Sequence, residues 1–122
     1  MTPRQLEILQ HALGLDQHGR NPHQTEWDKR EYTRNHFCAA GADEDTCREL
    51  VALGYMKEHL TTDVFPYYNC SVTDEGKAAI RRESPAPPVL TRSQRRYRDY
   101  MRVADLYEGF GDWLRAQKER AA

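Results

Sequence analysis

The sequence predicts a mainly α-helical protein with a small β-hairpin, which places it in the α+β class. Apolar residues recur at helical spacing in several segments of the chain. Two short runs, 55–60 and 64–72, instead show alternating positions, with Tyr, Met and His in the first and Phe, Tyr, Cys and Val in the second, and are separated by a polar turn. A proline-rich stretch then divides this part of the chain from a second helical segment.

The first helix has clear signals at both ends. Thr2 and Gln5 have the spacing of a capping box, and Pro3 suits the first helical position. Gly14 is expected to end the helix. The apolar residues between these ends share the helical spacing of a buried face: Leu6, Ile8, Leu9, Ala12 and Leu13.

Residues 15–31 are polar and weakly patterned, and a loop of that length is uncommon in a compact domain. We therefore expect Thr25 and Asp28 to cap a short helical turn that carries Trp27. A short element of undefined type is expected at 32–38.

A second helix is predicted at 43–53, ending at Gly54. The hairpin of strands 55–60 and 64–72 follows, and Pro66 leaves its end of the second strand unpaired. A third helix is expected to begin at Thr73 and to continue through Ile80.

The predicted organisation is a domain at 1–83, a proline-rich linker at 84–90 and an arginine-rich helical tail at 91–122. The tail is predicted to form helices at 92–106 and 111–118, separated by glycines. Residues 1–84 carry 10 Lys and Arg against 14 Asp and Glu, a net charge of −4, whereas 85–122 carry 8 against 5, a net charge of +3. This asymmetry indicates two surfaces with different partners.

The composition also indicates a compartment. The three cysteines, Cys38, Cys47 and Cys70, lack CxxC spacing and are expected to be small buried apolar side chains in a reducing cytosol. The sequence has no signal-peptide pattern and no apolar run long enough for a membrane helix. We therefore expect a cytoplasmic protein without a membrane partner.

Several strings resemble known protein groups. "LVALGYM", the hairpin after it and "SVTDEGKAAI" resemble the helix–wing–helix segment of winged-helix proteins. "HALGLDQHGR", "YTRNHF", "GYM" and "VTDEG" are similar to small proteins of tailed phages and prophages that carry no assigned function, and "SQRRYRDYMRV" with "FGDWL" resembles a segment found in such proteins. The resemblance implies a winged-helix-like domain at 1–83, a bacterial host, and no catalytic residues.

In a DNA-binding winged helix, the helix before the wing enters the major groove. Here that helix, 43–53, carries four carboxylates on positions expected to be exposed, and Arg48 is its only basic residue. The phosphates of DNA would repel such a face. The helix dipole explains acidic residues in the first turn but not Glu49.

The predicted wing is aromatic and nearly uncharged, and a tyrosine that faces outward there would suit a protein contact. The helix and the wing together supply the candidate protein-contact residues: Asp43, Glu44, Asp45, Arg48, Glu49, Tyr67 and Tyr68.

The tail supplies the candidate nucleic-acid residues, because arginines interleaved with aromatic residues can bind phosphates and stack on bases. They are Arg92, Arg95, Arg96, Arg98, Arg102 and Tyr97. Alternatively, these arginines pair with the acidic domain or with a second copy of the chain. Phe110, Trp113 and Leu114 need burial, so a homodimer through the C-terminal helices is a further hypothesis.

No enzyme, metal site or cofactor is predicted. His18, His23, His36 and Cys38 lack the tight ligand pairs of structural zinc sites. His36 and Cys38 are two residues apart, so they are poorly placed as a base and a nucleophile.

The favoured hypothesis is a phage or prophage accessory protein that binds a host or phage protein, with an anti-defence inhibitor as one form of it. The alternative is a DNA-binding winged-helix regulator that uses the arginine-rich tail and the wing.

Overall fold

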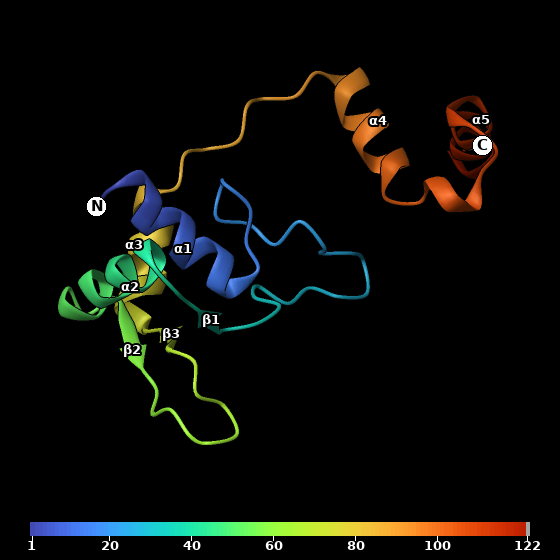
Figure 1. Cartoon of the computed structure of the whole chain (residues 1–122). Helices are drawn as coiled ribbons and strands as arrows, with labels where there is room; N and C mark the ends of the chain where they lie inside the picture. The colour runs from blue at the N-terminus through green and yellow to red at the C-terminus, as the bar shows by residue number, and fades with distance from the viewer. Residues whose placement is uncertain (122) are drawn as a thin grey trace. The chain divides into compact units, whose positions relative to one another are not determined.

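The computed structural model describes residues 1–121, which form two compact units (Figure 1). The first unit is Met1–Ala86 and the second begins at Pro87, so the boundary falls inside the segment 84–90. Each unit is described by itself.

The first unit contains three helices and a small antiparallel sheet, which confirms the predicted mainly α, α+β class. Its elements, in chain order, are α1 (Pro3–Leu13), β1 (Phe37–Cys38), α2 (Ala42–Ala52), β2 (Met56–Glu58), β3 (Asn69–Val72) and α3 (Asp74–Glu83).

Helix α1 begins and ends as predicted. The Thr2 hydroxyl accepts a hydrogen bond from the Gln5 backbone N–H, and the Gln5 side chain accepts one from the Thr2 N–H. Gly14 has φ 74°, a left-handed conformation in which it caps the last turn. The face between these ends is the largest part of the core, with Ile8, Leu9 and Leu13 almost fully buried.

The sheet has three strands in the order β1-β3-β2. The short element predicted at 32–38 contributes an edge strand of only two residues, in which Phe37 lies opposite Cys70. On the other side of β3, Met56 lies opposite Val72. Helices α1 and α3 both contact β3, and α2 contacts β2, so the three helices and the sheet enclose a single core.

The predicted strands 55–60 and 64–72 are both too long. Pairing ends soon after Glu58, and residues 59–68 form a loop that projects from the sheet (Figure 1). The Thr62 N–H donates to the Phe65 carbonyl and the Phe65 N–H donates to the Thr62 hydroxyl, both at 3.0 Å. These bonds close a local turn in place of strand pairing, and Pro66 has no N–H with which to continue a ladder.

The helical turn predicted around Trp27 does not form. The Thr25 hydroxyl does accept bonds from the N–H groups of Trp27 and Asp28, as a helix cap would, but no helix follows. The Asn21 side chain instead donates to the Arg30 carbonyl at 2.9 Å. Side chains that bond to the backbone in this way compete with helix formation, and Trp27 is left 91% exposed.

Cys47 and Cys70 are buried as predicted, but the prediction was wrong for Cys38, which is exposed. Successive side chains of a strand face opposite sides. Because Phe37 packs against the core, its neighbour Cys38 faces outward.

The second unit is helical. It contains α4 (Arg92–Met101), a 3-10 turn η1 (Ala104–Leu106) and α5 (Phe110–Ala121). The predicted helix 92–106 was too long, because the backbone of Val103, at φ −129° and ψ 19°, leaves the helical region. The predicted helix 111–118 was too short, because α5 extends from Phe110 to Ala121.

The structure predicts a difference in thiol reactivity. At about pH 8, Cys38 should react with a thiol-specific reagent in the native protein, because its thiol is exposed to solvent. Burial raises the pKa of Cys47 to about 12 and also raises that of Cys70. We expect one fast-labelling thiol in native protein and three in denaturant, counted by mass spectrometry. Fast native labelling of Cys47 or Cys70 would contradict the buried core.

A second prediction concerns Gly76 in the first turn of α3. A Cβ at this position would collide with the Tyr55 carbonyl oxygen and lie 2.7 Å from Val72 Cγ1. Gly76→Ala should therefore destabilise the first unit by about 1–3 kcal/mol, although alanine normally favours a helix. Urea unfolding followed by circular dichroism measures the change. Gly111→Ala in α5 is the matched control, because its Cβ meets no atom closer than 3.9 Å; a Gly76→Ala protein as stable as wild type would contradict the close packing.

Candidate binding surfaces

The first two carboxylates of α2 are neutralised within the first unit. The Arg4 guanidinium donates to both carboxylate oxygens of Asp43, at 2.8 and 3.0 Å, and so links α1 to the start of α2. Glu44 lies 3.8 Å from Arg48, one turn further along the same helix. Neither carboxylate is therefore a free negative charge for a partner.

Arg48 joins α2 to the base of the β2–β3 loop. Its guanidinium lies 3.5 Å from the Glu58 carboxylate on β2 and 4.4 Å from the centre of the Tyr68 ring, a cation–π contact. The Tyr68 hydroxyl donates to the same Glu58 carboxylate at 2.8 Å. Burial, followed by the bonds to neighbouring groups, raises the pKa of Tyr68, so it stays a neutral donor. The two candidates Arg48 and Tyr68 are thus brought together, but they contact one another.

Asp45 and Glu49 lie one turn apart on the exposed side of α2 and form no ion pair within residues 1–121. Glu49 accepts one hydrogen bond from the Gln5 amide of α1, at 3.0 Å. Of the four carboxylates predicted to line this helix, these two remain available to a cationic partner. The unpaired acidic surface of α2 is therefore smaller than the sequence suggests.

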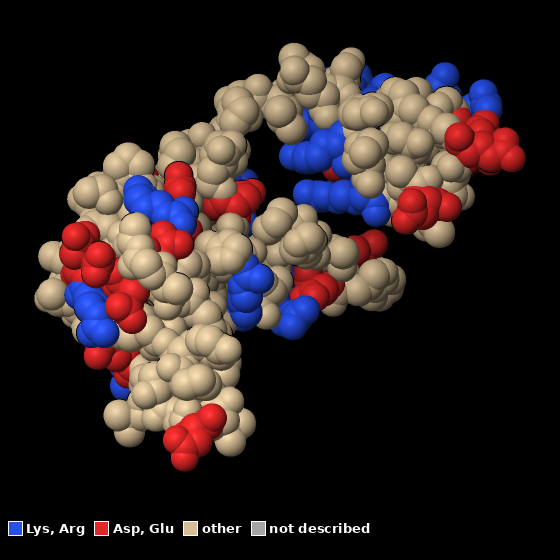
Figure 2. Space-filling model, viewed as in Figure 1, with Lys and Arg blue, Asp and Glu red and all other residues tan. Residues whose placement is uncertain are grey.

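The loop 59–68 is the most apolar exposed segment of the first unit. Leu60 and Val64 are each 94% exposed, Tyr67 is 63% exposed and Phe65 is 39% exposed. The rings of Phe65 and Tyr67 meet edge to face, with centroids 5.6 Å apart. Asp63 is the only charged residue of the loop, and Figure 2 shows it as a mainly uncharged projection. We call residues 59–68 the wing loop.

Tyr67 was predicted from the sequence as a contact residue, but the exposure of Leu60 and Val64 was not predicted. Both residues were assigned to strands, in which alternate side chains would be covered. The turn residues Thr61, Thr62 and Asp63 between them were the available signal that both lie at the tip.

In the second unit, α4 and α5 pack through aromatic rings. The Tyr100 ring lies 5.3 Å from the Phe110 ring and 6.1 Å from the Trp113 ring, and Tyr97 lies 5.4 Å from Phe110. Trp113 is buried. Of the three residues expected to need burial, Trp113 is therefore buried inside this unit, whereas Phe110 and Leu114 are half-buried.

All the candidate arginines of the tail are exposed: Arg92, Arg95, Arg96, Arg98 and Arg102. Arg98 pairs with Asp99 at 3.2 Å. Among the described residues of the second unit, no carboxylate pairs with the other four. Tyr97, the remaining nucleic-acid candidate, packs against Phe110 and is only half available for stacking on a base.

The His and Cys residues considered as metal ligands do not lie close together. Within residues 1–121, no group of three or more His, Cys, Asp or Glu side chains is placed to hold a metal ion. His18 contacts the Pro85 carbonyl oxygen at 2.9 Å, and the His36 ring lies 5.9 Å from that of Phe65.

The comparisons with known proteins found no relative of this chain. No protein-family model, curated protein or solved structure matches the chain. Among the helices of residues 1–121, none is both long enough and apolar enough to cross a membrane.

Proposed function

We propose that the first unit is a binding module that docks on another protein through the wing loop and the adjacent exposed side of α2. The observation that carries this proposal is the exposure of Leu60, Val64, Phe65 and Tyr67 on one projecting loop (Figure 1). Contiguous exposed apolar groups mark interaction sites on soluble proteins, and tyrosine is common among the residues that dominate binding energy.

The base of the wing loop is held in place before any partner arrives. Arg48 contacts both Glu58 and Tyr68, so the loop base and α2 are linked by an ion pair and a ring contact. A surface ordered in advance loses less conformational entropy on binding. Asp45 and Glu49 are exposed on α2, the helix that Arg48 links to the loop base, which favours a partner with an apolar pocket and Lys or Arg side chains.

This surface fits the protein-partner hypothesis better than groove recognition of DNA by α2. Arg48 is the single basic side chain of that helix, and it is already engaged by Glu44, Glu58 and Tyr68. An inhibitor that covers the cationic nucleic-acid groove of a host defence protein is one form of the proposal. Since Asp43 and Glu44 are neutralised, contact through the wing loop would contribute more to binding than negative charge.

The test begins with a photo-crosslinking residue at position 67, in the full chain and in lysate of a bacterial host, with the same residue at exposed position 119 as control. A partner of the wing loop should crosslink from position 67 and not from 119. The absence of any product specific to position 67 would contradict the proposal.

The crosslinked protein, once purified, allows an affinity test by calorimetry. The double substitution Phe65→Ser and Tyr67→Ser should weaken binding by roughly 30-fold or more, because truncating an anchor residue typically costs about 2 kcal/mol or more. Val89→Ser with Leu106→Ser is the matched control, since both side chains are exposed and apolar but lie in the second unit. Equal Kd values for the two double variants would show that the wing loop is not the contact.

A further test measures what the negative charges of α2 contribute to binding. Asp45→Lys with Glu49→Lys should mainly slow association and change its salt dependence, because exposed charges at an interface steer encounter. Stopped-flow or surface-based kinetics measure both rates. An association rate that does not change would remove α2 from the proposed surface.

A further inference from the structure

We infer that the second unit carries a separate site, in which α4 binds the phosphate backbone of duplex DNA without sequence preference. This site does not depend on the protein contact proposed for the first unit. It rests on the way the packing of α4 against α5 divides the side chains of α4 into two faces.

The two faces of α4 follow from helical spacing. With about 3.6 residues per turn, positions three, four or seven apart share a face. One face carries Tyr97 and Tyr100, whose rings pack on Phe110 of α5. The other is an arginine-rich face, which comprises Arg92, Arg95, Asp99 and Arg102, with Arg96 at its border.

This packing forces the arginine-rich face into solvent. If α4 were rotated so that its two faces changed places, several guanidinium groups would be buried without partners, which costs free energy. The aromatic cluster would also be exposed to solvent. Because Thr91 and Gln94 form a capping box, the start of the helix, and with it the position of Arg92, is also set. In Figure 2, blue side chains extend outward from the helices of this unit.

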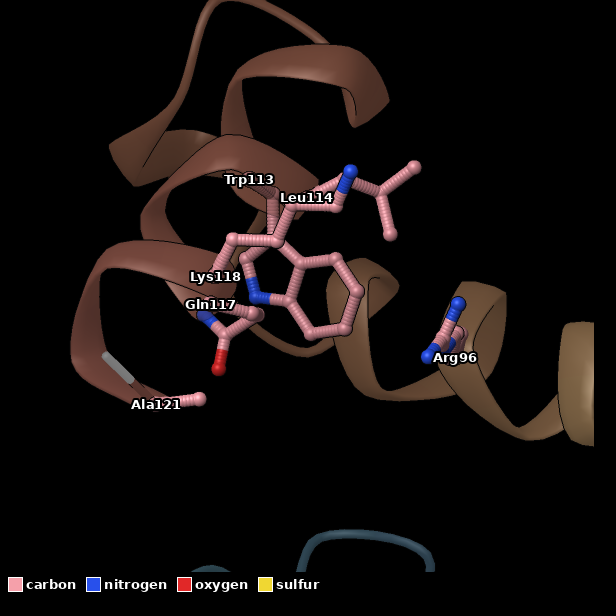
Figure 3. Close-up of a pocket in the computed structure, with 6 residues that line it drawn as sticks. All are labelled: Arg96, Trp113, Leu114, Gln117, Lys118 and Ala121. Atoms are coloured by element: carbon pink, nitrogen blue, oxygen red, sulfur yellow. The ribbon is translucent and has the colours of Figure 1, made fainter.

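Arg96 lies at the border between the two faces. It contributes from α4 to a groove of about 280 Å³ whose other residues come from α5, with Trp113 extending toward α4 (Figure 3). The residues of α5 that line the groove are Trp113, Leu114, Gln117, Lys118 and Ala121. Arg92, Arg95 and Arg102 extend the positive surface along the helix.

The dimensions of the face suit duplex DNA. Arg102 lies ten positions after Arg92. At a rise of about 1.5 Å per residue, this part of the helix spans about 15 Å, whereas the major groove is about 12 Å wide. A helix of this length that lies in or across the groove can place guanidinium groups near phosphates of both strands. A-form RNA has a narrow major groove that does not admit a helix in the same way.

The chemistry of the face favours backbone binding over recognition of bases. Recognition of single strands relies on aromatic rings that stack on bases, and the rings of α4 are packed toward α5. Adenine is recognised by Asn or Gln, but Gln94 is used as a cap for its own helix. What remains available is positive charge, which binds phosphates by releasing counterions.

The experiment measures binding of the full chain to a fluorescent random-sequence duplex of roughly 20 base pairs, by anisotropy, from about 50 to about 200 mM salt. With four phosphate contacts, the slope of log K against log salt should be near −3.6, since each contact contributes about −0.9. The triple substitution Arg92→Gln, Arg95→Gln and Arg102→Gln should reduce the magnitude of this slope by about 2.7 and weaken binding at the lowest salt by about tenfold or more.

Three further variants control for charge and folding. Arg115→Gln with Arg120→Gln removes charge from α5 at residues that do not line the groove and should cost clearly less affinity. Asp99→Asn removes the one carboxylate of the arginine-rich face and should strengthen binding, a gain that misfolding cannot produce. Replacing Arg92, Arg95 and Arg102 by Lys should retain most of the binding, because lysine also pairs with phosphate.

Several outcomes would overturn the inference. These are no DNA binding at about 50 mM salt, an equal loss of slope in the α4 and α5 variants, or unchanged binding by Asp99→Asn. Tighter binding of a single-stranded oligonucleotide would show that bases, and not the duplex backbone, are the target. Equal affinity for duplex RNA would show that α4 does not use the major groove of DNA.

Discussion

The first unit depends on the burial of one side of α1. Ile8, Leu9 and Leu13 are buried where α2, α3 and the central strand β3 contact α1, so these elements all pack against the same helix. Removing one such side chain typically costs about 2–5 kcal/mol, a large part of the stability of a domain of this size. The position of α2, and with it the direction of Asp45 and Glu49, follows from this packing because Cys47 and Leu50 fill the core from the opposite side of α2.

The small core also explains why the wing loop remains outside. The paired part of β2 and β3 supplies Met56, Cys70 and Val72 to the core, and little apolar space is left to fill. Beyond the paired residues the backbone of the loop turns back on itself. The alternation of side chains along a strand therefore no longer places half of them against the helices. Leu60 and Val64 are therefore solvent-exposed for a topological reason, although their side chains are as apolar as those of the core.

Charge is distributed differently in the two units. In the first, the basic residues Arg4 and Arg48 pair with neighbouring carboxylates, which leaves Asp45 and Glu49 as unpaired negative charges on α2. In the second unit, aromatic packing occupies one face of α4. The arginines on its other face have no carboxylate partners among the described residues of that unit. One chain thus combines a surface suited to a protein with a surface suited to phosphates, and the two are separate in sequence.

Local sequence was sufficient to place the main helices and for the class of the fold, because their signals act within about four residues: the Thr2 cap and the left-handed Gly14 are examples. It also located the positive charge of α4 and the aromatic character of the wing loop. It was not sufficient for the pairing of Phe37 with Cys70, for the exposure of Cys38, or for the contact of Arg48 with Glu58 and Tyr68. Those contacts join residues far apart in the chain, so only tertiary packing decided which charges and apolar groups were paired and which remained free to bind.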